Sequence, residues 1–179
     1  RRLKFIDSCQ FMNTSLAVLA ENLRKSGVEK FMHTKQHFQE HFDLVTRKGV
    51  YCFSYMSSFE KFNETELPPI HCFYNDLTET HITETEYQHA KDVWAAFEMT
   101  SLKQYHDTYL ATDVLILADV MTEFSRVCIR DYGLDPKHYV SLPGFSWDSM
   151  MRMVKAEISL LTDPEMHLFI ESSIRGGVA

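Results

Sequence analysis

The sequence predicts a helix-dominated α/β chain with few strands. Apolar residues recur at helical spacing over long stretches, and only short segments have a β-like pattern. Gly (6) and Pro (5) are scarce among the 179 residues, so long flexible or low-complexity regions are not expected. A hydrophobic content of 45% supports a buried core. The length suits one globular domain, or one domain and part of another.

The first part of the chain combines a short strand, a capped helix and an extended run. Residues 3–7 (Leu-Lys-Phe-Ile-Asp) alternate well enough to predict a short strand. The polar cluster at residues 13–15 predicts the N-cap of a helix that ends at Gly27. Its apolar positions are Leu16, Leu19, Ala20 and Leu23. Residues 50–53 (Val-Tyr-Cys-Phe) read as β-like or extended.

Two consecutive helices are predicted in the middle of the chain. Thr83 and Glu86 form a capping box, with Ile82 and Tyr87 as a hydrophobic staple, which starts a helix through Phe97. Residues 101–104 (Ser-Leu-Lys-Gln) form a second capping box. A stripe of about eight helical turns follows, closed by Gly133. Its members are Leu102, Tyr105, Tyr109, Leu110, Val114, Leu117, Met121, Phe124 and Cys128.

In the last part of the chain, the sequence predicts a connector and two shorter helices. Residues 134–142 read as the connector, and Ser146 as the N-cap of a helix with Trp147, Met150, Met151 and Val154 on its apolar face. The methionine-rich stretch 150–153 is expected to be core packing with one exposed residue. Asp163-Pro164 predicts the N-cap and first residue of a helix that carries Met166, Phe169 and Ile170.

Charge and cysteine usage narrow the classes of protein. The net charge of −7 argues against a nucleic-acid coat protein, which would be basic, but not against an enzyme that acts on nucleic acid. The four cysteines lack a Cys-x-x-Cys spacing and are expected to be free thiols in a reducing, intracellular compartment. No signal peptide and no apolar run near the roughly 18 residues of a membrane span are present, so no membrane partner is expected. The absence of an initial Met suggests an internal piece of a longer protein.

Tyr109 and Asp113 are the main candidates for chemistry. Residues four apart share one face of a helix, so both side chains point into the same volume. An Asp carboxylate is a hard ligand suited to Mg²⁺ or Mn²⁺, and a tyrosine hydroxyl can orient a water molecule or a phosphate. Asp113 could instead be solvated or salt-bridged at the edge of the stripe. One Asp cannot hold two metal ions, and Asp7 is a further candidate carboxylate in this chain.

His33, His37 and His41 are a competing metal candidate. On one helix they would share a face, and His at i and i+4 is a familiar zinc pair. The segment is polar, however, and no Cys or fourth ligand is near, so solvated histidines are the simpler interpretation.

Several ordered motifs resemble protein-primed family B DNA polymerases, especially the Polinton/Maverick-type and related viral, organellar and mobile-element enzymes. The segments that carry the resemblance cover essentially the whole chain: Phe5-Ile6-Asp7-Ser8, Ser15-Leu16-Ala17-Val18-Leu19, Thr46-Arg47-Lys48-Gly49-Val50-Tyr51, Ser58-Phe59-Glu60-Lys61-Phe62, Leu67-Pro68-Pro69, Tyr105 to Asp119, Tyr132-Gly133-Leu134-Asp135-Pro136, Leu142-Pro143-Gly144-Phe145-Ser146-Trp147-Asp148 and Ile174-Arg175-Gly176-Gly177.

The resemblance implies a role in a 3′→5′ exonuclease site. Tyr109 and Asp113 match the third exonuclease motif, in which Asp113 would be a metal ligand and Tyr109 would orient the water. Lys48 falls where the family has a catalytic lysine, which would stabilise charge on the phosphate. Without the resemblance, Lys48 reads as a surface lysine. The implied cofactor is a Mg²⁺ or Mn²⁺ pair completed by carboxylates outside this chain.

The resemblance also implies contacts with DNA. The family's (Ser/Thr)-Leu-x-x-hydrophobic motif, which binds the primer end, has two candidates, Ser15-Leu16 and Ser8 with Cys in the Leu place. Ser15 has helix capping as its simpler interpretation. The segment 174–177 matches the Tyr-x-Gly-Gly motif that contacts the template strand, with Arg175, Gly176 and Gly177 as DNA-binding residues and Ile174 in the place of Tyr.

The family implies a division of the chain and a set of partners. Residues 1–133 would be the C-terminal half of an RNase H-like exonuclease domain, and 134–179 a helical connector to the polymerase palm. Partners would be primer and template DNA, dNTPs and a terminal protein primer, in the nucleus or in viral or host cytoplasm. Neither Asp-x-Glu nor Asn-x-x-x-Phe-Asp precedes Tyr109, so the isolated chain is expected to be inactive. The alternative is an acidic, helix-rich protein-interaction module without catalysis.

Overall fold

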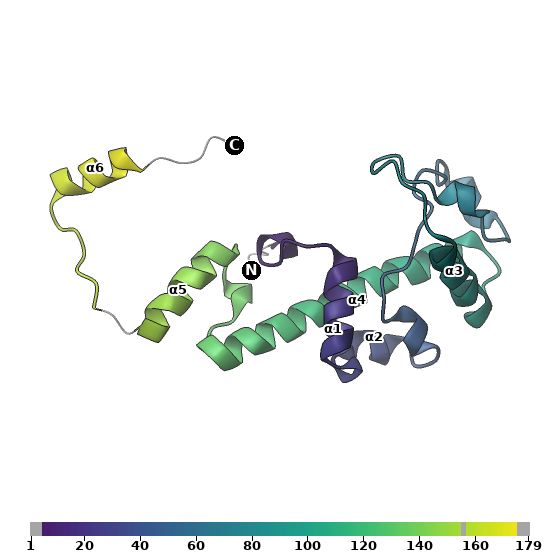
Figure 1. Ribbon diagram of the computed structural model, residues 1–179, viewed down its shortest axis with the longest axis horizontal. Helices are drawn as coiled ribbons and strands as arrows, with labels where there is room; N and C mark the ends of the chain where they lie inside the picture. Colours follow the sequence, from purple (N-terminus) through teal and green to yellow (C-terminus); the bar gives the residue numbers. More distant parts are fainter. Residues whose placement is uncertain (1–4, 155–156, 175–179) are drawn as a thin grey trace.

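The computed structural model describes residues 5–154 and 157–174, and helices dominate them. The helix-rich prediction is therefore confirmed. The α-helices are α1 (Leu16–Ser26), α2 (Met32–His37), α3 (Glu84–Ala96), α4 (Leu102–Tyr132), α5 (Leu142–Val154) and α6 (Pro164–Ser173). One short 3₁₀ helix precedes α1 and the others lie between the α-helices: η1 (Ser8–Gln10), η2 (Val28–Lys30), η3 (Phe42–Val45), η4 (Phe59–Asn63), η5 (Ile70–Phe73) and η6 (Pro136–His138). Figure 1 shows that α4 runs through the middle of the chain, with α1, α2, α3 and α5 beside it and α6 apart from it.

The β component of the prediction is wrong for the described residues, which contain no β-strand. Their one β-type pairing is an isolated antiparallel bridge between Asn75 and Thr80. Residues 5–7 and 50–52 are irregular, and residues 53–55 form a turn. A strand needs a neighbour for its backbone groups. Here the carbonyl of Val50 instead accepts a hydrogen bond from the Tyr105 hydroxyl at 2.6 Å.

The capping signals of the sequence are confirmed for α1 and α3. The Ser15 hydroxyl accepts a hydrogen bond from the Val18 amide, and Gly27 ends α1 with φ 136°. At α3, the Thr83 hydroxyl accepts from the Glu86 amide while the Glu86 carboxylate accepts from the Thr83 amide at 2.7 Å. Both ends of this reciprocal pair satisfy donors that a helix start leaves free.

The second predicted capping box, at the start of α4, is wrong. The Ser101 side chain makes no capping hydrogen bond. The Gln104 side chain accepts from the Thr100 amide at 2.7 Å, one residue earlier than the motif requires. The Leu102 amide donates to the Glu64 carbonyl at 2.8 Å. A distant loop therefore satisfies a donor that the local motif was expected to satisfy.

Thr83, whose side chain caps α3, and Ser101, whose side chain caps nothing, give a matched pair of variants. Thr83→Ala removes a capping oxygen and is expected to lower the free energy of unfolding by about 1 kcal/mol. Ser101→Ala removes a hydroxyl that caps nothing and is expected to change it by less than about 0.5 kcal/mol. Urea unfolding followed by circular dichroism at pH 7 measures both values. Equal losses would contradict the assignment of the caps.

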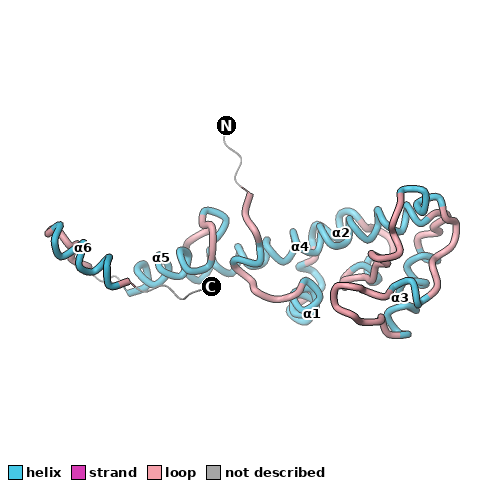
Figure 2. Tube along the Cα trace, turned by 90° about the horizontal axis from the view of Figure 1, so that it is seen from above, coloured by secondary structure: helices cyan, strands magenta, loops and turns pink. Residues whose placement is uncertain are grey.

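Helix α4 packs against different elements at its start, in its middle and in its last third. Its first turns, through Leu102 and Tyr105, join a cluster with α3, Cys52 and Phe73. Its middle, through Ile116 and Val120, packs against Ala20, Leu23 and Phe31. Its last third joins a third cluster, whose buried members are Phe11, Cys128 and Phe145. The side view in Figure 2 shows α3 at one end of α4, α1 near its middle and α5 at the other end.

A buried carboxylate joins α4 to the start of α2. Asp119 is 1% exposed and accepts three hydrogen bonds: from the His33 amide (2.7 Å), the Thr34 amide (3.0 Å) and the Thr34 hydroxyl (2.6 Å). Phe31, the residue before α2, has no side-chain acceptor to cap the helix. The cap of α2 is therefore supplied by a residue 85 positions away from Thr34.

The C-terminal helices depart from the sequence prediction in two ways. Helix α5 begins at Leu142, because the Ser141 carbonyl already accepts from the Phe145 amide, so Ser146 lies inside the helix and the predicted N-cap is wrong. Met150 and Met153 are exposed, so the expected core packing of the methionine stretch is also wrong. Helix α6 begins as predicted, with the Asp163 side chain accepting from the Glu165 amide. Every residue of α6 is exposed.

Candidate functional site

Tyr109 and Asp113 lie one turn apart on α4, in the half of the helix that faces the loop after η3. Both side chains are partly buried. The loop carries Lys48 and Gly49 against this part of the helix. A Cβ placed on Gly49 would lie 3.5 Å from the Tyr109 ring, which is ordinary contact distance. The loop therefore packs against Tyr109 through a backbone without a side chain.

The Tyr109 ring is held among other aromatic rings. Tyr51 stacks on it with ring centroids 4.9 Å apart, and Phe53 meets it edge-on at 6.0 Å. The hydroxyl of Tyr51 in turn forms a 2.7 Å hydrogen bond with Nδ1 of His106, and its ring lies parallel to that of Tyr105. These contacts fix the direction in which the Tyr109 hydroxyl points.

The electrostatics of the pair follow from burial. Burial is the main cause that raises the pKa of Tyr109 above its ordinary value, and the Asp113 carboxylate adds to it. Burial also raises the pKa of Asp113, while the Lys48 cation and the Tyr109 hydroxyl act in the opposite direction. The buried Oδ1 atom of Asp113 has no hydrogen-bond partner among the described residues. The structure therefore brings together the three residues predicted to be catalytic.

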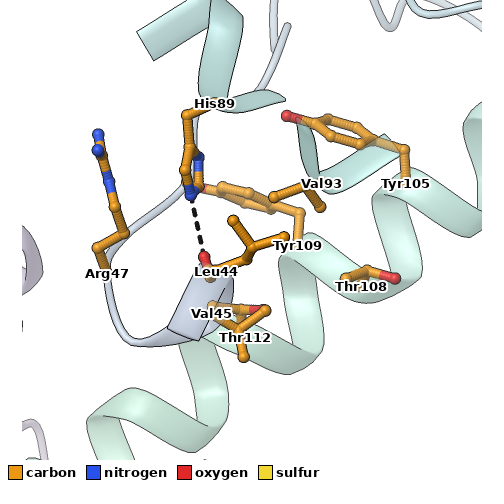
Figure 3. Close-up of a pocket in the computed structure, with 10 residues that line it drawn as sticks. Leu44, Val45, Arg47, His89, Val93, Tyr105, Thr108, Tyr109 and Thr112 are labelled. Carbon is orange, nitrogen blue, oxygen red and sulfur yellow. Dashed lines mark hydrogen bonds between the residues drawn. The ribbon is translucent and has the colours of Figure 1, made fainter. Parts of the chain in front are cut away.

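A small cavity lies beside the Tyr109 ring, and Figure 3 shows its walls. Its volume of about 20 Å³ is enough for about one water molecule. The residues that line it are Leu44, Val45, Arg47, Gly49, His89, Val93, Tyr105, Thr108, Tyr109 and Thr112. Nε2 of His89 lies 3.0 Å from the Leu44 carbonyl, and burial lowers the pKa of His89. His89 and Tyr51 were not predicted as site residues, because their partners lie 45 and 55 positions away.

The predicted metal ligands outside this group are not brought to it. Asp7 accepts a hydrogen bond from the Cys9 amide at the start of η1. The residue after η1, Phe11, packs against Phe124, which lies about 16 Å along α4 from Asp113. Asp7 therefore belongs to the other end of the helix.

The three histidines do not share one helical face, so the condition for the competing metal site is not met. Helix α2 ends at His37, and His41 lies beyond it in a left-handed conformation with φ 55°. His33 contacts the Thr122 hydroxyl, whereas His41 packs against Phe97. Within residues 5–154 and 157–174, no group of three or more His, Cys, Asp or Glu side chains is placed to hold a metal ion.

The candidate DNA-binding residues lie in different places. Leu16 packs against the cluster that contains Ile116, one turn beyond Asp113. Ser8 belongs to η1, near the third cluster of α4. Ser15 caps α1, as its simpler interpretation expected, and its exposed position leaves it accessible. The three predicted template contacts, Arg175, Gly176 and Gly177, lie outside the described residues.

Asp113→Asn tests the electrostatics of the site. The pKa of Asp113 is raised above its ordinary 3.8 in the folded chain, so ionisation of this carboxyl opposes folding. The penalty is absent below the unfolded pKa and complete above the folded one. At pH 7 the free energy of unfolding of the variant is therefore expected to be about 1 kcal/mol higher than that of the wild type. This difference should become smaller toward pH 4.

Urea unfolding at several pH values measures this difference. Asp107→Asn is the control, because Asp107 lies on the exposed face of the same helix and pairs with Lys103. Its effect on the free energy of unfolding is expected to stay below about 0.5 kcal/mol. A destabilised Asp113→Asn variant at pH 7 would show that the carboxylate is well satisfied.

Comparisons with known proteins add no family. No protein-family model, curated protein or solved structure matches the chain. None of the described helices is both long and apolar enough to cross a membrane. The functional interpretation therefore depends on the residues of the site and on the motifs of the sequence.

Proposed function

We propose that this chain supplies the third motif of a metal-dependent 3′→5′ exonuclease in a protein-primed family B DNA polymerase. The observation that carries the proposal is the position of Asp113: a partly buried carboxylate with an unpartnered buried oxygen, one turn from Tyr109 and within electrostatic reach of Lys48. A buried carboxylate oxygen without a hydrogen-bond partner is unfavourable unless something binds it. A divalent cation is such a ligand.

The other two side chains suit hydrolysis of a phosphodiester. The phenol of Tyr109 is protonated at neutral pH, and burial raises its pKa further, so the hydroxyl can donate a hydrogen bond to a water molecule or a phosphate oxygen. Stacking on Tyr51 holds the ring in one orientation. Lys48 supplies a positive charge on the same side, which would oppose the negative charge that develops on the phosphate.

A pair of Mg²⁺ or Mn²⁺ ions would polarise the phosphate and activate the water. Within this chain, Asp113 would hold one cation, Tyr109 would orient the attacking water, and Lys48 would bind the non-bridging phosphate oxygens. One carboxylate is too few for two ions. The proposal therefore requires the Asp-x-Glu and Asn-x-x-x-Phe-Asp motifs in a longer polypeptide.

The wider assignment follows from the same proposal. Residues 1–133 would belong to an RNase H-like exonuclease domain whose sheet is not formed by the described residues. Residues 134–179 would lead to a polymerase palm. The intact enzyme would act inside the cell on primer and template DNA, use dNTPs and start from a terminal protein.

A second candidate function is a protein-interaction module without catalysis. The observation that favours it is the exposed apolar surface of α5 and α6, which includes Trp147, Met153 and Phe169. In that case the unpartnered oxygen of Asp113 would have no role. The two candidates differ in whether Asp113 has a function in hydrolysis.

The test begins with the longer reading frame and the isolated chain. The first two exonuclease motifs are expected upstream of Arg1, and Asp-x-x-Ser-Leu-Tyr-Pro downstream of Ala179. If neither flank contains them, the polymerase proposal fails. The purified 179-residue chain is expected not to degrade single-stranded DNA with Mn²⁺, because its metal site is incomplete. Degradation that disappears in Asp113→Ala would contradict the incomplete site.

A further inference from the structure

We propose that α6 docks, by its apolar stripe, into the groove between α4 and α5 of its own chain. This inference is independent of the nuclease proposal, because it concerns the opposite end of α4. Figure 1 shows α6 apart from α5, at the end of an extended segment. Both the groove and the helix present apolar side chains to solvent in that arrangement.

The groove has the character of a helix-binding site. Its cavity volume is about 510 Å³, and its lining is mainly apolar. Helix α4 contributes Phe124, Val127, Cys128 and Tyr132, and α5 contributes Leu142, Phe145, Ser146, Ser149, Met150, Met153 and Val154. Met153 is 64% exposed and Val154 is 63% exposed. Methionine side chains adapt readily to an apolar helix face.

Helix α6 has an apolar stripe of the matching kind. Met166, Phe169 and Ile170 are spaced i, i+3 and i+4, so they share one face. All three are exposed, and Phe169 is 67% exposed. An isolated helix of 10 residues is only marginally stable in water. A stable α6 therefore needs a surface against which this stripe can pack.

The length of the connection favours the groove of the same chain over that of a second copy. Nine residues, 155–163, separate the end of α5 from the start of α6. Their contour spans up to about 30 Å, which is long enough for α6 to fold back along α5. A short tether gives an effective concentration of about millimolar, well above the protein concentration in a dilute solution.

Hydrogen exchange of residues 164–173 in the full chain tests the docking. In the wild type these amides are expected to exchange at least about tenfold more slowly than in an unfolded peptide. Phe169→Glu places a charge in the stripe and should remove this protection. Leu168→Glu is the matched control: the same kind of change on the opposite face of α6 should leave the protection unchanged. Met153→Glu, on the groove side, should remove it as Phe169→Glu does.

Each result supports or overturns the proposal. Exchange of α6 at the unfolded rate in the wild type overturns it. Protection that survives Met153→Glu shows that α6 docks elsewhere, which also overturns it. Protection that falls on dilution, together with a dimer mass in light scattering, shows docking onto a second copy and overturns the same-chain arrangement. Met153 is exposed, so Met153→Glu is not expected to disturb the core. A melting temperature close to that of the wild type would verify that this variant folds.

Discussion

Asp119→Ala is expected to lower the free energy of unfolding by about 3–5 kcal/mol. This is the largest effect on stability that we expect from a single substitution in α4. The substitution leaves the buried amide and hydroxyl of Thr34 and the partly buried amide of His33 without an acceptor. A typical domain has only about 5–15 kcal/mol of stability, so a large share would be lost. The start of α2 should then separate from α4.

Urea unfolding of the wild type and the variant measures this loss. Asp107→Ala is the control on the same helix, since Asp107 is exposed and pairs only with Lys103 in an i, i+4 arrangement. Its expected effect is below about 0.5 kcal/mol. Asp119→Asn retains one carbonyl oxygen and should fall between the two. A loss in Asp119→Ala no larger than that of the control would mean that the cap of α2 contributes little.

Asp113→Ala is expected to reduce 3′→5′ exonuclease activity by about 10²–10³-fold in the longer polypeptide that the proposed function requires. The physical reason is the loss of a metal ligand, which reduces kcat much more than it changes the affinity for DNA. Lys48→Ala should reduce kcat by about 10–10²-fold, because a charge that stabilises the transition state is lost while the ligands remain. Polymerisation should be unaffected in both variants.

A single-stranded oligonucleotide labelled at its 5′ end provides the assay, with Mg²⁺ or Mn²⁺ present. Tyr109→Phe keeps the ring stack with Tyr51 and removes only the hydroxyl, so it separates the orientation of water from packing. Asp107→Ala is again the control and should retain full activity. Wild-type rates in Asp113→Ala would rule out a role in hydrolysis, and loss of polymerisation as well would indicate misfolding.

Local signals in the sequence predicted most helix boundaries correctly. The Thr83–Glu86 box and the Gly133 stop each depend on residues within one or two turns, so the sequence contains all the information needed. The start of α4 was different. Its first amide donates to Glu64, a contact across 38 positions that no local motif reports.

The same contrast applies to the candidate site. The Tyr109–Asp113 spacing is visible in the sequence because both residues lie on one helix. The approach of Lys48 depends on the path of an irregular loop that is anchored by a hydrogen bond between Tyr105 and the Val50 carbonyl. Residues 50–53 were expected to be β-like or extended, and they have no strand neighbour in the described chain, so β propensity alone does not make them a strand.

Helix α4 has neither Gly nor Pro among its 31 residues, so nothing in its sequence favours a kink or a hinge. It is a straight, continuous helix about 46 Å long that packs against three separate hydrophobic clusters. The spacing of Tyr109 and Asp113 is therefore set by the helix itself and does not depend on which element packs at the α5 end.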